Sequence, residues 1–219
     1  VGLRVPNHPI ALQLLRAFGG GIAAPSANRF CRISPTQAQH VAEELGDAVD
    51  LILDGGACQV GVESTIIDLS GTTPRLLRRG HITADQIQAV LQTELIIPDS
   101  AKHTPSDEIR APGMMAVHYA PLTTALLCPN DRLQDLINQL ILENKRIAVM
   151  TYQTAMTETG QTQVMKMPQS AETYAQCLYA SLRELDHQQR DVIIVEQPPT
   201  TAEWSAINDR LEKATVPDR

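Results

Sequence analysis

Residues 24–28 read Ala-Pro-Ser-Ala-Asn, and two related stretches follow: Ser-Pro-Thr at 34–36 and Val-Glu-Ser-Thr-Ile at 62–66. In each stretch small hydroxyl or amide side chains follow an apolar run. Strand ends and helix starts expose backbone N–H groups, and these bind phosphate oxygens together with such side chains. The three stretches therefore predict a phosphate-binding pocket, built at strand ends and at one helix start.

Short helices and strands alternate around these stretches through the first 92 residues. Apolar spacing and Gly or Pro boundaries predict helices at 9–18, 35–45 and 84–92. Alternating or continuous apolar runs predict strands at 21–24, 49–54, 64–69 and 75–77. Ser34 has the position of an N-cap with Pro35 at the first helical position, and Thr83 has that of a second N-cap.

The second half has a clearer alternation of strands and helices. Strands are predicted at 125–128, 146–152 and 191–196, and helices at 132–144, 171–186 and 203–214. Between the halves, residues 93–123 contain four prolines and little periodicity, which indicates a long linker. The fold class is therefore α/β: a twisted-sheet domain at 1–92, the linker at 93–123 and a small Rossmann-like parallel domain at 124–219.

Composition excludes several classes of protein. The formal net charge is −7 and aromatic residues make up 3%, which disfavours a broad nucleic-acid surface. Residues 1–92 carry seven Arg and no Lys, which favours forked recognition of anions. The four cysteines form no C-x-x-C pair, and no apolar run approaches the roughly 20 residues that span a bilayer. We therefore expect a cytoplasmic protein with reduced thiols and no membrane partner.

Each candidate residue also has an ordinary structural interpretation. Ser34 can be a plain N-cap, Ser26 and Asn28 can be turn formers, and Ser64 can end a strand. Arg78 and Arg4 can be solvated cations. The histidines at 8, 40 and 81 lack the spacing of a metal site. From residues alone, these alternatives stay open.

Several motifs in one order match a known family. They are GLRVPNHP at 2–9, APSANRF at 24–30, ISPT at 33–36, LDGG at 53–56, GVEST at 61–65, LRRG at 77–80, APGMM at 111–115, HYAP at 118–121 and AINDRL at 206–211. This combination resembles the YrdC-like threonylcarbamoyl-AMP synthases of the two-domain type, over nearly the whole chain.

The resemblance implies a nucleotidyltransferase. Its reaction would form L-threonylcarbamoyl-AMP from ATP, L-threonine and bicarbonate, release pyrophosphate and use Mg²⁺ with ATP. A separate tRNA threonylcarbamoyl transferase would then modify an adenosine in tRNA, so tRNA would be only an indirect partner. Positioning and charge stabilisation carry such a reaction, and no acid or base residue is assigned.

The resemblance also implies residue roles. Arg4, Ala24 and Ser64 would bind threonine, with Arg4 forking its carboxylate. The expected ATP-binding residues are Ser26, Asn28, Ser34, Arg78 and Tyr119. Among these, Tyr119 would move with the linker and close over ATP as part of a lid.

Two departures from the family pattern affect these expectations. The family has a Lys-x-Arg element upstream of the Gly-Leu-Arg strand, and this chain opens on Val1 within that strand. The expectation is a catalytic domain that lacks its first part, either inactive without that segment or misfolded. Cys31 stands where the family more often has Gly, which would strain the loop if the position needs a positive φ.

Two other function classes remain. One is a non-catalytic RNA-binding or regulatory YrdC-like module. The other is the carbamoyl-adenylate-forming domain of a hydrogenase-maturation type protein. The linker motifs and the C-terminal α/β pattern favour the threonine enzyme over the latter.

Overall fold

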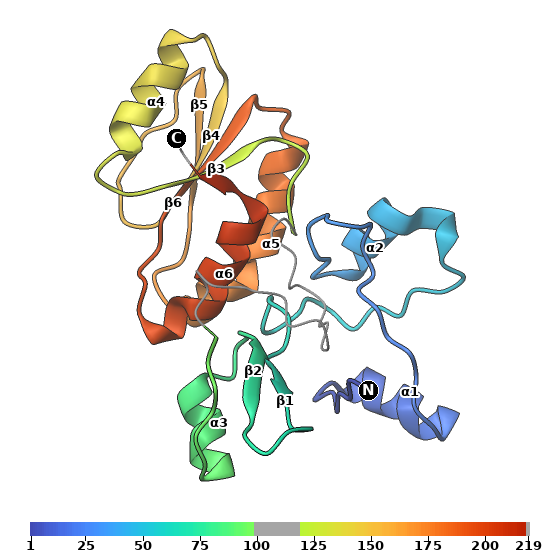
Figure 1. The fold of residues 1–219 in the computed structure, drawn as a ribbon. Helices are drawn as coiled ribbons and strands as arrows, with labels where there is room; N and C mark the ends of the chain where they lie inside the picture. Colours follow the sequence, from blue (N-terminus) through green and yellow to red (C-terminus); the bar gives the residue numbers. More distant parts are fainter. Residues whose placement is uncertain (99–118, 218–219) are drawn as a thin grey trace.

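The computed structural model describes residues 1–98 and 119–217 and is α/β, as predicted. Its main layer is a five-stranded parallel sheet in the order β5-β4-β6-β3-β7 (Figure 1). The strands are β3 (Ala125–Cys128), β4 (Ile147–Thr151), β5 (Thr162–Lys166), β6 (Val192–Glu196) and β7 (Val216–Pro217). The division into 1–92, 93–123 and 124–219 stays a prediction.

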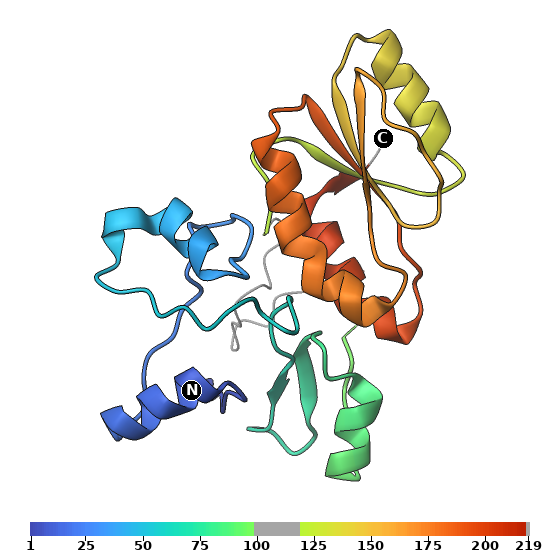
Figure 2. The same cartoon turned by 180° about the vertical axis from the view of Figure 1, so that it is seen from behind.

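Helices cover both faces of this sheet, which explains its nearly continuous apolar strands. Helix α4 (Leu133–Leu142) packs on the face that carries Ile147, Val149 and Ile194. The other face meets α5 (Ala171–His187) and α6 (Ser205–Ala214), the latter preceded by the 3₁₀ turn η3 (Ala202–Trp204) (Figure 2). Side-chain alternation along each strand thus supplies two cores.

The front half contains short elements with little burial of their own. Strands β1 (Ile66–Asp68) and β2 (Arg75–Arg78) form an antiparallel hairpin. The helices are α1 (Pro9–Phe18), α2 (Ala38–Leu45) and α3 (Ala84–Leu91), with the 3₁₀ turn η1 (Gly46–Ala48) after α2. No residue of these helices is buried. Thr83 and Gln86 form a capping box at α3, which confirms the predicted cap.

The front half packs against the second half through a few residues. Ile33 and Val62 belong to the same buried cluster as α5 and α6. Gly61, at φ 78°, brings its backbone so close to α5 that a Cβ there would lie 2.2 Å from the carbonyl oxygen of Ala175. Arg183 of α5 donates to the carbonyl of Ile33 and forms an ion pair of 2.7 Å with Glu44.

Some predicted elements were wrong. Residues 21–24 and 49–54 do not form strands, because no other described segment pairs with their backbone. Helix α2 begins at Ala38 and not after Ser34, and its N-cap Gln37 makes no side-chain capping bond. The short strands β5 and β7 were not predicted. Cys31 does hold a positive φ, 61°, where a glycine would be unstrained.

The predicted linker falls mostly outside the described residues. Within the described ranges, the structure contains no helix of the length and apolarity needed to cross a bilayer.

Gly61→Ala is expected to destabilise the protein by about 2–4 kcal/mol, because the added Cβ meets backbone atoms of α5 and a left-handed φ disfavours a side chain. Thermal unfolding followed by Trp204 fluorescence measures the loss. Gly160→Ala is the matched control, since its Cβ would meet nothing within 4 Å. Equal melting temperatures for the two variants would contradict the close approach.

Candidate functional site

The carboxylate of Glu63, three residues before β1, contacts residues of both halves. Its Oε1 accepts a hydrogen bond of 2.6 Å from the Ser34 hydroxyl. Its Oε2 accepts bonds from the Tyr179 hydroxyl at 3.0 Å and from Nε of Arg210 at 2.7 Å. One carboxylate therefore joins the Ser-Pro-Thr stretch to α5 and α6.

Arg210 of α6 is the cation of this cluster, and its side chain is fully buried. Besides Glu63, it donates from Nη2 to the carbonyl of Arg79 at 3.0 Å and from Nη1 to Asp209. The guanidinium also lies over the ring of Tyr119, 5.3 Å from its centroid. The buried charge is thus paired and hydrogen-bonded on several sides, as burial of an ion requires.

Two further candidate residues, Arg78 and Ser64, lie beside the Arg210–Glu63 ion pair. Nε of Arg78 donates to the carbonyl of Ser64 at 3.0 Å, and this bond connects β2 to the residues just before β1. Burial lowers the pKa of the Arg78 guanidinium, and the charges of Arg210 and Arg4 act in the same direction. An arginine stays protonated even so, so Arg78 brings a positive charge close to Arg4 and Glu63.

Burial and charge also decide the protonation of the acidic and phenolic groups. Burial alone would raise the pKa of Glu63, but the charge of Arg210 and the hydrogen bonds from Ser34 and Arg210 hold it below its ordinary value of 4.5. Burial, reinforced by Glu63, raises the pKa of both Tyr119 and Tyr179. At neutral pH the cluster therefore holds an ionised carboxylate beside neutral phenols.

The remaining candidates lie apart from this cluster or face their own turn. Ala24 and Ser26 are exposed. Asn28 donates to the carbonyls of Arg29 and Arg32, both at 3.0 Å, as a turn former does. Its Oδ1 is buried without a hydrogen-bond partner among the described residues, and the predicted ATP contact of Asn28 stays a prediction. The structure thus gathers Ser34, Ser64, Arg78 and Tyr119, with Arg4 in electrostatic range.

Tyr119 itself is buried at the junction of the two halves. Its ring centroid lies 5.6 Å from that of Tyr179, and its backbone has a φ of 65°. The next residues are held as well: Ala120 donates to the carbonyl of Cys31, and Leu122 and Thr123 donate to the Asp186 carboxylate. The end of the predicted lid is therefore anchored on both halves, while the lid motion stays a prediction.

Sequence reasoning assigned no role to Glu63, Tyr179 or Arg210. A signal was present for Arg210. The buried residues of α6 are Ala206, Ile207, Arg210, Leu211 and Ala214, so the arginine lies in the middle of an apolar helical face. No comparable signal marks Tyr179, because a tyrosine on an apolar face is ordinary core.

The carboxyl ends of the parallel strands are where open α/β sheets usually bind ligands. Here that edge is occupied by the protein's own carboxylate. Glu196, the last residue of β6, is fully buried and accepts the backbone N–H groups of Tyr152, Gln153 and Thr154 at 2.5 to 3.2 Å. The Thr154 hydroxyl adds a bond of 2.7 Å. These donors are therefore not available to a phosphate in this arrangement.

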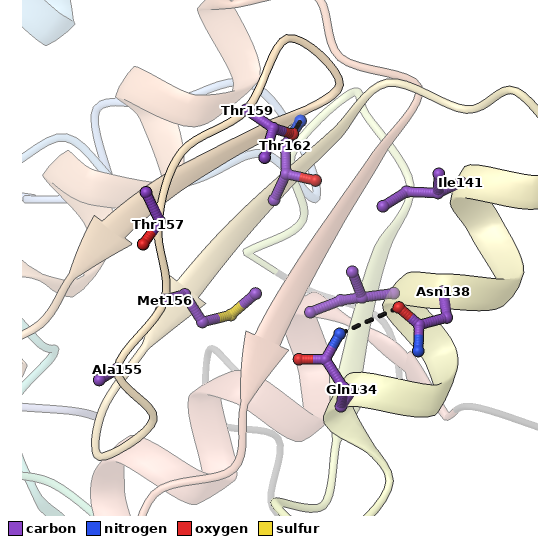
Figure 3. Close-up of a pocket in the computed structure, with 9 residues that line it drawn as sticks. Gln134, Asn138, Ile141, Ala155, Met156, Thr157, Thr159 and Thr162 are labelled. Carbon is purple, nitrogen blue, oxygen red and sulfur yellow. Dashed lines mark hydrogen bonds between the residues drawn. The ribbon is translucent and has the colours of Figure 1, made fainter.

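A cavity of about 260 Å³ lies between α4 and the segment that leads into β5 (Figure 3). Gln134 donates to Asn138 across its α4 side at 3.0 Å. The lining residues are Gln134, Ile137, Asn138, Ile141, Ala155, Met156, Thr157, Thr159 and Thr162. They carry hydroxyls, amides and apolar groups but no charge, so this cavity does not suit a nucleotide phosphate, and it contains none of the predicted site residues.

The family described as "Threonylcarbamoyl-AMP synthase, C-terminal domain" matches residues 82–216, and one described as "Telomere recombination" matches residues 1–80. The chain belongs to the threonylcarbamoyl-AMP synthase family.

Individual relatives agree with this assignment. A threonylcarbamoyl-AMP synthase of Bacillus subtilis is 38% identical over 98% of this chain and 62% of its own length. One of Schizosaccharomyces pombe is 34% identical over 97% of this chain and 56% of its own length. The crystal structure of Pyrococcus abyssi Sua5 complexed with L-threonine superposes with a TM-score of 0.86 at 32% identity, covering 99% of this chain and 65% of that one. The chain thus spans about three fifths of the curated relatives it matches.

Glu63→Gln is expected to cost about 3 kcal/mol of unfolding free energy, because it leaves the buried guanidinium of Arg210 without its main counter-ion. The amide nitrogen that replaces one carboxylate oxygen would also lie next to groups that donate hydrogen bonds, so those bonds would be lost. Urea unfolding measures the change, and Glu43→Gln, on the exposed face of α2, is the control.

The ion pair between Glu63 and Arg210 also makes the free energy of unfolding depend on pH. Because the folded pKa of Glu63 lies below 4.5, its contribution is present above that pH and is lost as the pH falls through the lower folded value. The difference in stability between the native protein and Glu63→Gln should shrink as the pH falls below about 4.5. A difference that stays constant down to pH 2 would refute an ionised Glu63.

Proposed function

We propose that the protein synthesises L-threonylcarbamoyl-AMP from ATP, L-threonine and bicarbonate and releases pyrophosphate. The product would serve the threonylcarbamoyladenosine modification of tRNA. The observation that carries the proposal is the gathering of Ser34, Ser64, Arg78 and Tyr119 around one buried ion pair, in a chain of this family. The threonine bound to the related P. abyssi protein supports the choice of amino acid.

The reaction balances without a redox step. Threonine and bicarbonate condense to a carbamate with loss of water. A carbamate oxygen then attacks the α-phosphorus of ATP, the new P–O bond forms, and the bond to the β-phosphate oxygen breaks. Pyrophosphate leaves in line with the attack. The chain need only hold the partners in line and meet the charge that develops on the phosphoryl oxygens.

Each candidate residue has a part in this proposal. Arg4 forks the threonine carboxylate, the Ser64 side chain contacts threonine, and the backbone at Ala24 seats it. Ser26, Asn28 and Ser34 face the nucleotide. The protonated Arg78 balances phosphate charge. Mg²⁺, a cation that prefers oxygen ligands, enters with the triphosphate and lowers its charge.

Tyr119 and the linker supply the exclusion of water. A mixed carbamic–phosphoric anhydride hydrolyses readily, so closing the site over ATP preserves the product. A tRNA threonylcarbamoyl transferase would take up the product, and tRNA itself would meet this protein only indirectly. The proposal places the protein in the cytoplasm beside that transferase.

Pyrophosphate release from ATP is the direct test. It is measured with and without threonine and with and without bicarbonate, on this chain and on a chimera that carries the family's Lys-x-Arg segment ahead of Val1. Release by the chimera that requires both threonine and bicarbonate is expected. If neither form shows it, and the protein binds RNA tightly with a steep salt dependence, the non-catalytic RNA-binding module replaces the proposal.

Arg4 and Arg78 are expected to bind different substrates, threonine and ATP respectively. Arg4→Ala should raise KM for threonine, and Arg78→Ala should raise KM for ATP, each by about tenfold or more because a charged hydrogen bond is lost. Steady-state kinetics measures both constants, and Arg16→Ala, on the exposed side of α1, is the control. Equal effects of Arg4→Ala and Arg78→Ala on both substrates would contradict these roles.

A further inference from the structure

Arg210 lies in the other half of the chain, yet it contacts the neighbours of two candidate substrate residues and the ring of a third. It holds Glu63, which precedes Ser64, and the carbonyl of Arg79, which follows Arg78. It also lies over the ring of Tyr119. With five N–H donors in a rigid plane, an arginine fixes such partners relative to one another in a way that lysine cannot.

Glu63 connects Arg210 to a further candidate residue, Ser34. Its Oε2 accepts hydrogen bonds from Arg210 and Tyr179 of the second half, and its Oε1 accepts the hydrogen bond that the Ser34 hydroxyl donates. A hydroxyl has one proton, so Ser34 is left with lone pairs to present to a ligand. The orientation of the Ser34 hydroxyl, a candidate ATP contact, therefore depends on the carboxylate of Glu63. The position of that carboxylate depends in turn on Arg210 of α6.

Stability alone is a poor reason for this construction. An ion pair buried at a junction often contributes less than apolar residues of the same volume, because both charges must lose water. What such a pair provides is a single geometry, because the guanidinium donates to the Glu63 carboxylate, to the Arg79 carbonyl and to Asp209 at the same time. Ser64 and Arg78 lie where that single geometry matters for the proposed reaction.

We propose that Arg210 is a positioning residue of the synthase site: through Glu63 it orients the Ser34 hydroxyl and the backbone at Ser64, so that α6 completes the site without touching substrate. This inference rests on the proposed function for its kinetic consequence. The coupling between Arg210 and the 33–36 and 62–66 segments does not depend on activity.

The first experiment compares Arg210→Lys and Arg210→Met with Lys213→Met in the form of the protein that shows release. Lys213 is the matched control, because it lies on the same helix and pairs with Asp209 at 2.6 Å without contacting Glu63. Arg210→Met should lower kcat/KM for ATP by about tenfold or more, the factor that a lost charged hydrogen bond carries. Arg210→Lys should recover part of this loss, and Lys213→Met should stay near the native value.

A mutant cycle separates positioning from a general structural effect. If Arg210 acts through Glu63 and Ser34, the loss caused by Arg210→Lys should shrink in a Ser34→Ala background. Additive losses would overturn the proposal. Tyr179→Phe removes one bond to the same carboxylate oxygen with little change in volume, so it repeats the cycle even if Arg210→Lys does not fold.

Amide hydrogen exchange gives a readout without catalysis. Arg210→Lys should speed exchange in residues 33–36 and 62–66, whereas Lys213→Met should leave both segments unchanged. Unchanged exchange in Arg210→Lys would refute the coupling, whatever the kinetics. Faster exchange in a protein that has no threonine-dependent release would instead leave the coupling standing and refute the proposed function.

Discussion

The ion pair between Arg210 and Glu63 is the interaction on which the arrangement of this protein depends. It brings a fully buried cation from the last helix to a carboxylate of the front half. A buried charge must be paired and hydrogen-bonded, and the relative position of the two halves satisfies this arginine with Glu63 and the carbonyl of Arg79. The candidate substrate residues Ser34, Ser64 and Arg78 are gathered as a consequence of that position.

A second set of charged contacts supports the same junction along α5. Arg183 bonds to the carbonyl of Ile33 and to Glu44, and Asp186 pairs with Arg32 while it accepts the N–H groups of Leu122 and Thr123. The last residues of the predicted lid are therefore held by the same helix that holds the front half, and they belong to the interface between the two halves.

The two halves differ in how they are stabilised. The parallel sheet has helices on both faces and buries its strand β4 completely, whereas α1, α2 and α3 contain no buried residue. The front half obtains much of its order from the junction, through Ile33, Val62 and the close approach at Gly61. A polar junction of this kind serves a binding site well, since it orients hydroxyls and guanidinium groups that an apolar contact would leave free to rotate.

Much of the fold was predictable from local pattern. The helices at 9–18, 84–91 and 171–187 and the strands at 125–128 and 192–196 follow from apolar periodicity, caps and glycine stops, which are properties of neighbouring residues. The predictions at 21–24 and 49–54 were wrong because a strand needs a partner, and an apolar run does not state whether one is present. Ser34 and Pro35 likewise formed a plausible helix start, but α2 begins only at Ala38, and the Ser34 hydroxyl donates to the carboxylate of Glu63.

The sequence by itself determined most of the elements, the family and the residue types suited to a phosphate and a carboxylate. Only the tertiary structure decided that Glu63 forms one cluster with Tyr179 and Arg210, which follow it by 116 and 147 residues. The reason is physical: helix and strand patterns depend on interactions across a few residues, whereas the pairing of a buried charge depends on which distant backbone and side-chain groups the packing brings within about 3 Å.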